Sequence, residues 1–278
     1  MRKRNALHRL LQGSVALFVT CLLALPSALA LTPEQAKPIM DGLHLVRVHS
    51  YQAINAFYSF SLSPGDKSAL ADVRDEINQV NGQMNRLESL EGVVDIQGTL
   101  SELSAKWQAY KELLNTNVND VVEQGYPDLR LVSDMAQLNV DMNEIAARAY
   151  REAREKSGYN PRDEVELIRQ SIYLLESMMT KYSARSASNV AQVFQGADTE
   201  KPIDEQARLL DKNLEKLARL DLPPELVKRR DKVQAQWAFI RNSYINYNEN
   251  NVFYVVNRYS KRIVKHMNAM LEALEAEA

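Results

Sequence analysis

The sequence predicts an all-α protein: two tandem up-and-down four-helix bundles that follow a cleaved signal peptide. Apolar residues recur in steps of three and four along most of the chain, which is the spacing of a helix face that packs in a core. Prolines and glycines fall almost only between these periodic stretches, where helices end. No stretch alternates long enough with the period of two that a β-strand would show. Short turns between long helices favour antiparallel neighbours, and hence bundles.

A repeat of 130 residues divides the chain into two copies. A shift of 130 places the apolar stripe around Trp107 on the stripe around Trp237 without a gap. The same shift aligns a second helix of each copy, in which Ile77, Val80, Met84, Leu87 and Leu90 fall on Ala207, Leu210, Leu214, Leu217 and Leu220. We therefore expect one bundle over residues 31–157 and another over residues 158–278, with one tryptophan in each core.

Residues 1–30 have the three-part pattern of a secretory signal peptide. Four basic residues precede an apolar run from Val15 to Leu25, and Ala28-Leu29-Ala30 supplies small residues for cleavage. The apolar run is shorter than the ~20 residues of a membrane span. The sequence thus predicts export to a periplasm with cleavage after Ala30, in preference to a retained N-terminal anchor.

Charge and cysteine content both change when this leader is removed. The leader holds four of the 34 basic residues and none of the 36 acidic ones, so the remaining chain carries 30 against 36, a net charge of about −6. This balance argues against a general nucleic-acid binder. The single cysteine, Cys21, lies within the leader. The mature chain would therefore fold without disulfides, which suits a protein large enough to bury its own core.

The first copy begins with two helices joined by a turn. The first is expected from Pro33 to Phe60, and the segment 61–68 is a turn by composition. The second helix carries the apolar stripe that contains Ile77. A further turn over residues 91–98 is expected to end this half of the copy.

The second half of the first copy is expected to hold two more helices. Thr99 and Glu102 have the spacing of a capping box at the start of the third helix. This helix carries Trp107 and is expected to break at the asparagine-rich segment 115–119, because asparagine competes for backbone hydrogen bonds. The fourth helix starts near Pro127 and carries Leu131, Met135, Leu138, Met142, Ile145 and Ala149 at steps of three and four.

The second copy repeats this order. Gly158 is expected to cap the preceding helix, and Asn160 before a proline is a start signal for the next. The first helix of this copy is expected over Pro161–Phe194, with a turn over residues 195–202. The second helix is expected to end before Pro223.

The last two helices of the second copy flank another asparagine-rich segment. The third helix carries Trp237, and residues 246–251 form the expected turn. The fourth helix matches its counterpart at a shift of 132, so this turn is two residues longer; its apolar positions are Ile263, Met267, Met270 and Leu274.

The second copy resembles a known family of extracytoplasmic sensors. Spaced leucines are followed by a proline-containing turn and a helix with a spaced tryptophan, as in Leu210-x3-Leu214-x2-Leu217-x2-Leu220, Pro223-Pro224-Glu225 and Val233-x3-Trp237. This order is similar to the N-terminal domain of type IV pilus methyl-accepting chemotaxis transducers, the PilJ-type module that nitrate/nitrite sensor kinases also contain. The first copy resembles the same module more faintly. The resemblance covers most of the mature chain through generic spacing, and it implies a helical bundle with a sensory role.

One departure limits what the resemblance implies. The first helix of that family often carries a Gly-Arg-Gln-Arg-Met-Leu-type stretch, whose arginine meets the anion in the nitrate sensors. The corresponding residues 174–185 read Leu-Leu-Glu-Ser-Met-Met-Thr-Lys-Tyr-Ser-Ala-Arg, without the Gly-Arg pair. Nitrate binding is therefore not implied. No second span or signalling domain follows in the sequence, so a sensory signal would pass to another protein.

The sequence offers no motif for catalysis or for a cofactor. There is no Gly-x-Ser-x-Gly, no glycine-rich phosphate loop and no mature cysteine. His44 and His49 are five residues apart, about 140° around a helix, so they do not share a face. Methionines at apolar stripe positions, such as Met267 and Met270, are interpreted as core residues and not as copper ligands. We expect no enzyme activity, no metal and no cofactor.

The first helix contains an uncharged stretch, residues 48–63, that is rich in aromatic residues. Its large side chains spread over most of the helix circumference at 100° per residue. Some of them must meet something outside their own bundle. One interpretation is a central helix covered by the other bundle. The other is a self-association or partner interface, whose candidate contacts are Tyr51, Phe57, Tyr58 and Phe60.

The last helix concentrates basic residues on one face. Arg258, Lys261, Arg262 and Lys265 oppose an apolar stripe. A solvated face is the simpler interpretation, and docking to anionic headgroups or to an acidic partner is the alternative.

These observations predict a non-enzymatic periplasmic sensory or accessory binding module that signals through an envelope or membrane protein. The alternative is a structural or adaptor protein that binds another envelope protein through helix surfaces without a small ligand. A homodimer and a small anionic ligand are further expected partners, whereas nucleic acid is not. An anion would meet Arg47 or Arg185, because arginine captures planar anions, with Lys181 and Tyr182 as secondary candidates. A surface or structurally paired arginine is the simpler interpretation of both positions.

Overall fold

The chain is all-helical in the part that the structure, a computed structural model, describes: residues 31–187, 201–249 and 252–276. These residues form eight α-helices and one short 3-10 helix. The leader expected over residues 1–30 lies outside the described residues, as does most of the turn expected over 195–202. None of the described helices is long and apolar enough to cross a membrane.

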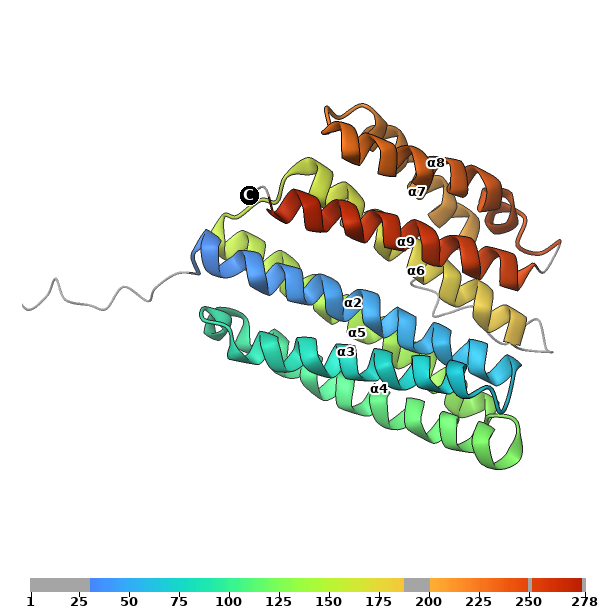
Figure 1. The fold of residues 1–278 in the computed structure, drawn as a ribbon. Coiled ribbons are helices and arrows are strands. Elements are labelled where there is room, and N and C mark those ends of the chain that lie inside the picture. Colours follow the sequence, from blue (N-terminus) through green and yellow to red (C-terminus); the bar gives the residue numbers. More distant parts are fainter. Residues whose placement is uncertain (1–30, 188–200, 250–251, 277–278) are drawn as a thin grey trace, which may run out of the picture.

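The helices fall into two groups that each share a hydrophobic core. The first helix group comprises α2 (Pro33–Leu62), α3 (Lys67–Ser89), the 3-10 helix η2 (Val93–Ile96), α4 (Gln97–Gln124) and α5 (Leu129–Ser157). The second helix group comprises α6 (Asp163–Ala187), α7 (Ile203–Ala218), α8 (Pro224–Ile245) and α9 (Phe253–Ala276). Figure 1 shows α3 and α4 on one side of α2 and α5, with α6 and α9 next and α7 and α8 outermost.

Several helix ends follow from local sequence. Thr32 caps α2 through a capping box with Gln35, and Asp66 and Asp128 accept backbone hydrogen bonds at the starts of α3 and α5. Gly158 ends α5 with a φ of 68°, a left-handed conformation that glycine adopts at low cost. The sequence prediction of a cap at Gly158 is confirmed.

Helix α4 corrects two sequence predictions. It continues through the asparagine-rich segment 115–119, where a break was expected, and ends at Gln124. The apolar stripe continues with Val118 and Val121, so burial outweighs the local preference of asparagine. Asn117 is fully buried, and its side chain donates to the Leu113 carbonyl at 2.9 Å.

The expected capping box at Thr99 is also wrong. Helix α4 begins at Gln97, directly after η2, so Thr99 lies inside the helix. Its hydroxyl donates to Glu152 of α5 at 2.8 Å. The two buried apolar residues Val93 and Ile96 of η2 fix the entry of the chain into α4 in place of a side-chain cap.

The two tryptophans occupy equivalent places in the two cores. Trp107 is 1% exposed and Trp237 is 4% exposed, as the repeat predicted. The Trp107 indole N–H donates to Asn81 Oδ1 at 2.9 Å, and the Trp237 indole N–H donates to Asp211 Oδ1 at 2.8 Å. Asn81 and Asp211 are themselves 130 residues apart. The repeat therefore includes the polar partner of each tryptophan as well as its apolar neighbours.

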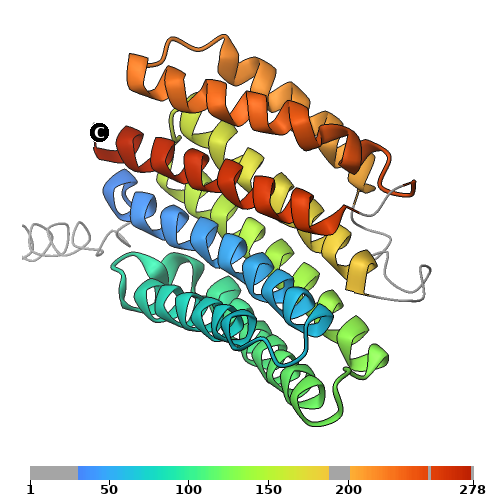
Figure 2. The ribbon, with the colours of Figure 1, turned by 45° about the vertical axis from the view of Figure 1, so that its right-hand side comes forward.

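Helices α2 and α6 join the two groups. They lie side by side and run in the same direction, as Figures 1 and 2 show. Polar contacts between them keep a nearly constant offset along the chain, from Arg169–Asp41 through Glu176–Gln52 to Ser183–Asn55. The first helix of each copy thus packs on the first helix of the other.

The large aromatic residues in the uncharged stretch of α2 are buried in the core of the first helix group, and α6 covers part of the stretch. Tyr51, Phe57, Tyr58 and Phe60 are each at most 3% exposed. Tyr51 forms an edge contact with Tyr173 of α6 at a ring distance of 5.7 Å. The interpretation of a central helix is therefore correct, and the four aromatic residues leave no surface for an external interface.

Candidate functional site

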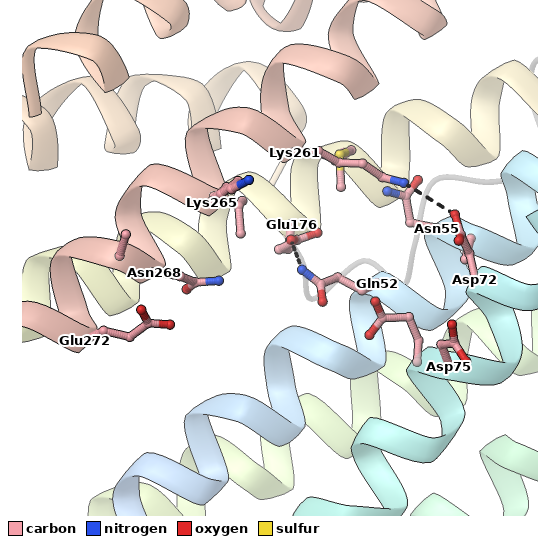
Figure 3. A pocket seen from close by; sticks show the side chains of 14 residues that line it. Gln52, Asn55, Asp72, Asp75, Glu176, Lys261, Lys265, Asn268 and Glu272 are labelled. Carbon is pink, nitrogen blue, oxygen red and sulfur yellow. Dashed lines mark hydrogen bonds and ion pairs between the residues drawn. The ribbon is translucent and has the colours of Figure 1, made fainter. Parts of the chain in front are cut away.

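A cavity of about 590 Å³ lies between the two helix groups. Helices α2 and α6 form its floor, and α3 and α9 form its walls (Figure 3). The walls thus come from different groups. A volume of this size is within the range of small-molecule sites.

Glu176 is the central polar group of the floor. Its side chain extends from α6 and is 1% exposed. The Gln52 amide of α2 donates to Glu176 Oε1 at 2.6 Å (Figure 3). Within the described residues, Glu176 Oε2 has no hydrogen-bond partner. A buried acceptor without a donor costs free energy, so this position suits a ligand that supplies one.

Burial raises the pKa of Glu176 to about 8, because the charged carboxylate loses hydration in the floor of the cavity. The hydrogen bond from Gln52 and the positive charge of Lys261 act in the opposite direction, whereas the nearby Glu76 carboxylate raises the pKa further. The carboxyl therefore titrates near neutral pH. A cation that binds beside this carboxyl would favour its charged form.

The rest of the floor combines amide and apolar groups. Asn55 is 1% exposed, and its Oδ1 accepts a hydrogen bond from the Ser183 hydroxyl of α6. Apolar side chains of all but one of the lining helices complete the surface: Ala56, Met179, Val264 and Ala269. A ligand with both polar ends and an alkyl segment would match this mixture.

The walls are charged and predominantly acidic. Helix α3 contributes Asp72, Asp75 and Glu76, and helix α9 contributes Lys261, Lys265, Asn268 and Glu272. Lys261 faces Asp72 across the cavity at 4.0 Å, and His49 contacts Glu76 at 2.8 Å. Lys261 and Lys265 belong to the basic face noted in the sequence. Part of that face therefore lines the cavity instead of facing only solvent.

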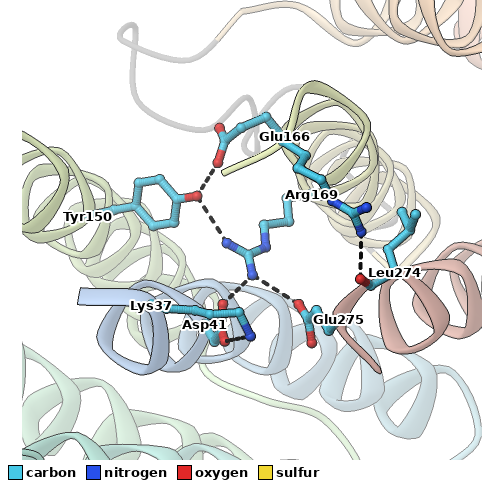
Figure 4. Close-up of polar contacts among 8 residues, drawn as sticks. Lys37, Asp41, Tyr150, Glu166, Arg169, Leu274 and Glu275 are labelled. Atoms are coloured by element: carbon cyan, nitrogen blue, oxygen red, sulfur yellow. Dashed lines mark hydrogen bonds and ion pairs between the residues drawn. The ribbon is translucent and has the colours of Figure 1, made fainter. Parts of the chain in front are cut away.

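A second polar cluster fixes the helices beside the cavity. Arg169 of α6 is 6% exposed and reaches Asp41 of α2, Glu275 of α9 and the Tyr150 hydroxyl of α5 (Figure 4). Glu275 lies one turn beyond the cavity residue Glu272. One buried arginine therefore ties together four helices from both groups, next to one end of the candidate site.

The four ligand residues expected from the sequence lie outside this cavity. The Arg47 guanidinium stacks on the Tyr173 ring at 3.8 Å. Arg185 donates to the Asn248 carbonyl at 3.1 Å, and Lys181 donates to the Lys201 carbonyl at 2.7 Å. The Tyr182 hydroxyl accepts a hydrogen bond from the Val252 amide at 3.0 Å. Arg47 and Arg185 are thus engaged in contacts within the chain, at separate places along α2 and α6.

The sequence reasoning missed Glu176. A signal was present, because Glu176 is the only charged residue between Arg169 and Lys181, in the run Gln-Ser-Ile-Tyr-Leu-Leu-Glu-Ser-Met-Met-Thr. A lone acid in such a run is placed in a helix interface. The contributions of α3 and α9 could not be found in this way, because those acids look like ordinary solvated helix faces.

Comparisons with known protein families, with curated proteins and with solved structures find no match to this chain. In the described part of the chain, no group of three or more histidine, cysteine, aspartate or glutamate side chains is placed to hold a metal ion.

Proposed function

We propose that this protein is a non-enzymatic sensory or accessory binding module, which takes a small ligand into the cavity between its two helix groups. The observation that carries the proposal is the cavity floor, where the buried Glu176 carboxyl presents an oxygen without a donor. The cavity walls come from α3 and α9, one from each group. Ligand binding would therefore change how the two groups sit against each other.

The same proposal places the protein in the periplasm. The leader pattern of residues 1–30 supports export, and the structured part supports cleavage after Ala30. Leu31 is already 2% exposed, and Thr32 caps the first helix. N-terminal sequencing of protein recovered from the periplasmic fraction should begin at Leu31. An uncleaved protein that stays with the membrane would contradict the export proposal.

We further propose two degenerate copies of a PilJ-type four-helix unit, with residues 31–157 and 158–278 as the tandem bundles. The equivalent tryptophan contacts to Asn81 and Asp211 support the duplication. A module of this kind would pass its signal to an envelope or membrane protein.

A panel of small molecules tests ligand binding. A ligand that binds the folded state stabilises it by about 2.7 kcal/mol at a concentration 100 times its Kd. The melting temperature of the full chain should rise with at least one member of a panel of cations, anions and neutral metabolites. The rise should be lost in Ala269→Leu, which fills the cavity, and retained in Ala109→Leu, an exposed alanine of α4. No shift with any class would reject the proposal.

A second function, an adaptor that binds an envelope protein through its helix surfaces, is favoured by one patch. Phe239 of α8 is 62% exposed, and its ring contacts the ring of Tyr259 of α9 at a centroid distance of 4.7 Å. Exposed aromatic residues often mark interfaces. An adaptor would retain a partner in a Phe239-dependent manner and would show no ligand-induced shift.

A further inference from the structure

The floor and walls of the cavity define the charge of the ligand. Three of the wall charges already have a partner, since Lys261 faces Asp72 and Glu76 contacts His49. Asp75 and Glu272 then stand against Lys265 alone at the walls. The field in the cavity is negative even before Glu176 ionises, and it attracts cations.

The floor indicates the kind of cation. Glu176 offers a carboxylate oxygen without a donor, and an ammonium carries up to three N–H donors. Glu176 is 1% exposed, so an ammonium must displace the half-buried Gln52 amide to reach the carboxyl group and supply a donor to Oε2. The Met179, Val264 and Ala269 side chains offer apolar contact for methylene groups.

From this geometry, and on the basis of the function proposed above, we propose that the ligand is a small aliphatic organic amine. One ammonium binds Glu176 on the floor, and the alkyl chain lies along Met179 and Val264. A second ammonium of a di- or polyamine would meet Asp75 or Glu272 at the walls. A basic amino acid would use the same floor and place its carboxylate near Lys265.

Calorimetric titration of the full chain with spermidine, putrescine and lysine tests this proposal. Glu176→Gln keeps the size of the side chain and removes its charge, and it should weaken amine binding at least about tenfold. Asp75→Asn should also weaken amine binding. Glu215→Gln, which removes an exposed carboxylate of α7 outside the cavity, should leave the affinity unchanged. Circular dichroism should show native helicity for all three variants.

Lys265 gives a readout that a merely structural role would not produce. Removal of this like charge in Lys265→Gln should strengthen binding of putrescine and spermidine by about two- to fivefold, whereas lysine would lose the partner of its carboxylate. An anionic ligand would respond in the opposite direction. If putrescine and spermidine bind but lysine does not, the ligand is a polyamine. If only lysine binds, the ligand is a basic amino acid.

Proton release provides a separate measurement. Glu176 is mainly protonated at neutral pH, and a bound ammonium favours its charged form. The titratable groups near it are Glu76 of α3, Tyr244 of α8, and Lys261 and Lys265 of α9, and the amides of Gln52 and Asn55 of α2 lie beside it. Amine binding should release a proton, seen as a heat that depends on the ionisation enthalpy of the buffer. Glu176→Gln should abolish this release.

Two results would overturn the amine proposal and leave the binding function intact. One is Lys265-dependent binding of nitrate or a carboxylate that Ala269→Leu blocks. The other is a response to magnesium or calcium alone at the same site. Absence of any response, from amines and from all other classes, would reject both the amine and the binding function.

Discussion

At the scale of single residues, the two tryptophans have the same surroundings at positions 130 residues apart: a buried apolar site and a hydrogen-bond acceptor for the indole N–H. Each indole is buried in the core of its helix group and donates to a side chain 26 residues earlier in the chain. In the second copy, burial alone would raise the pKa of Asp211, but hydrogen bonds from Arg241 and Trp237 outweigh it and hold the pKa below its ordinary value. In the first copy, the uncharged Asn81 accepts the indole hydrogen bond instead.

Truncation of either tryptophan should therefore destabilise its core. We expect Trp107→Ala and Trp237→Ala each to lower the free energy of unfolding by ~3–5 kcal/mol, as for other buried aromatic residues. Denaturant unfolding followed by circular dichroism measures this change. The exposed Phe239→Ala provides the control and should cost far less. Near-neutral stability of both tryptophan variants would show that the indoles serve another purpose than packing.

Glu176 predicts a pH dependence of stability. Its folded pKa of about 8 exceeds its ordinary value of 4.5, so the folded state binds the proton more tightly than the unfolded state. The stability that this proton contributes is complete below pH 4.5 and is lost as the pH rises through 8. As the pH rises from 4.5 through 8, wild type should therefore lose stability relative to Glu176→Gln. The loss should reach a few kcal/mol, at ~1.4 kcal/mol per pKa unit.

Urea unfolding of both proteins at several pH values tests this expectation. The exposed Glu215→Gln should show the wild-type profile. A constant difference between Glu176→Gln and wild type across this range would mean that Glu176 is not desolvated in the folded protein.

At the scale of helices, Arg169 is the contact that holds several elements together. Its side chain is 7% exposed and bridges Asp41 of α2 and Glu275 of α9, while Tyr150 of α5 accepts a further hydrogen bond. Removing one partner of a buried ion pair leaves the opposite charge buried without a counter-charge. This costs more free energy than the intact pair contributes to stability.

Arg169→Met should therefore lower the unfolding free energy by ~3–5 kcal/mol, because methionine retains the apolar stem but removes the buried cation that joins Asp41 to Glu275. Asp41 would keep only its ion pair with Lys37 at 3.8 Å. Arg148→Met supplies a matched control, since the Arg148–Glu102 pair is 42% and 53% exposed and such pairs contribute ~0–1 kcal/mol. Equal effects of the two substitutions would argue against a clamp at Arg169.

The helices could be predicted well from the sequence, and their irregular ends less well. The apolar stripes around Trp107 and Trp237 gave the correct helices and the correct core, because burial of such stripes dominates helix packing. The break predicted at the asparagine-rich segment 115–119 was wrong, because the apolar stripe continues past this segment to Val121. The matching segment in the second copy does end its helix, at Ile245, where no such stripe follows.

At the scale of the whole molecule, the cavity depends on contacts that no local pattern encodes. Helices α3 and α9 become its walls only because α2 and α6 pack side by side and in parallel. The uncharged stretch of α2 correctly indicated contact with something beyond its own bundle. The other bundle was one of the two covers that the sequence suggested for this stretch, but nothing local revealed that the contact between α2 and α6 includes a buried carboxyl at Glu176.

The seam between the helix groups, where α2 packs on α6, contains several polar contacts. Ser183 donates to Asn55, Thr180 to the Tyr51 carbonyl, and Gln52 to Glu176. Polar seams fix a particular register but contribute less stability than apolar packing of the same area. A ligand that supplies a donor to Glu176 would act on this seam and would reach both groups at once.

The most direct test of the cavity as the binding site is a methyl spectrum of the full chain labelled at methionine, recorded with the compound that most raises the melting temperature. Met179 lines the cavity, whereas Met135 is buried in the core of the first helix group. We predict that the Met179 methyl resonance shifts during the titration and that the Met135 resonance stays in place. An unchanged Met179 resonance, with the response confined to other methionines, would contradict the account.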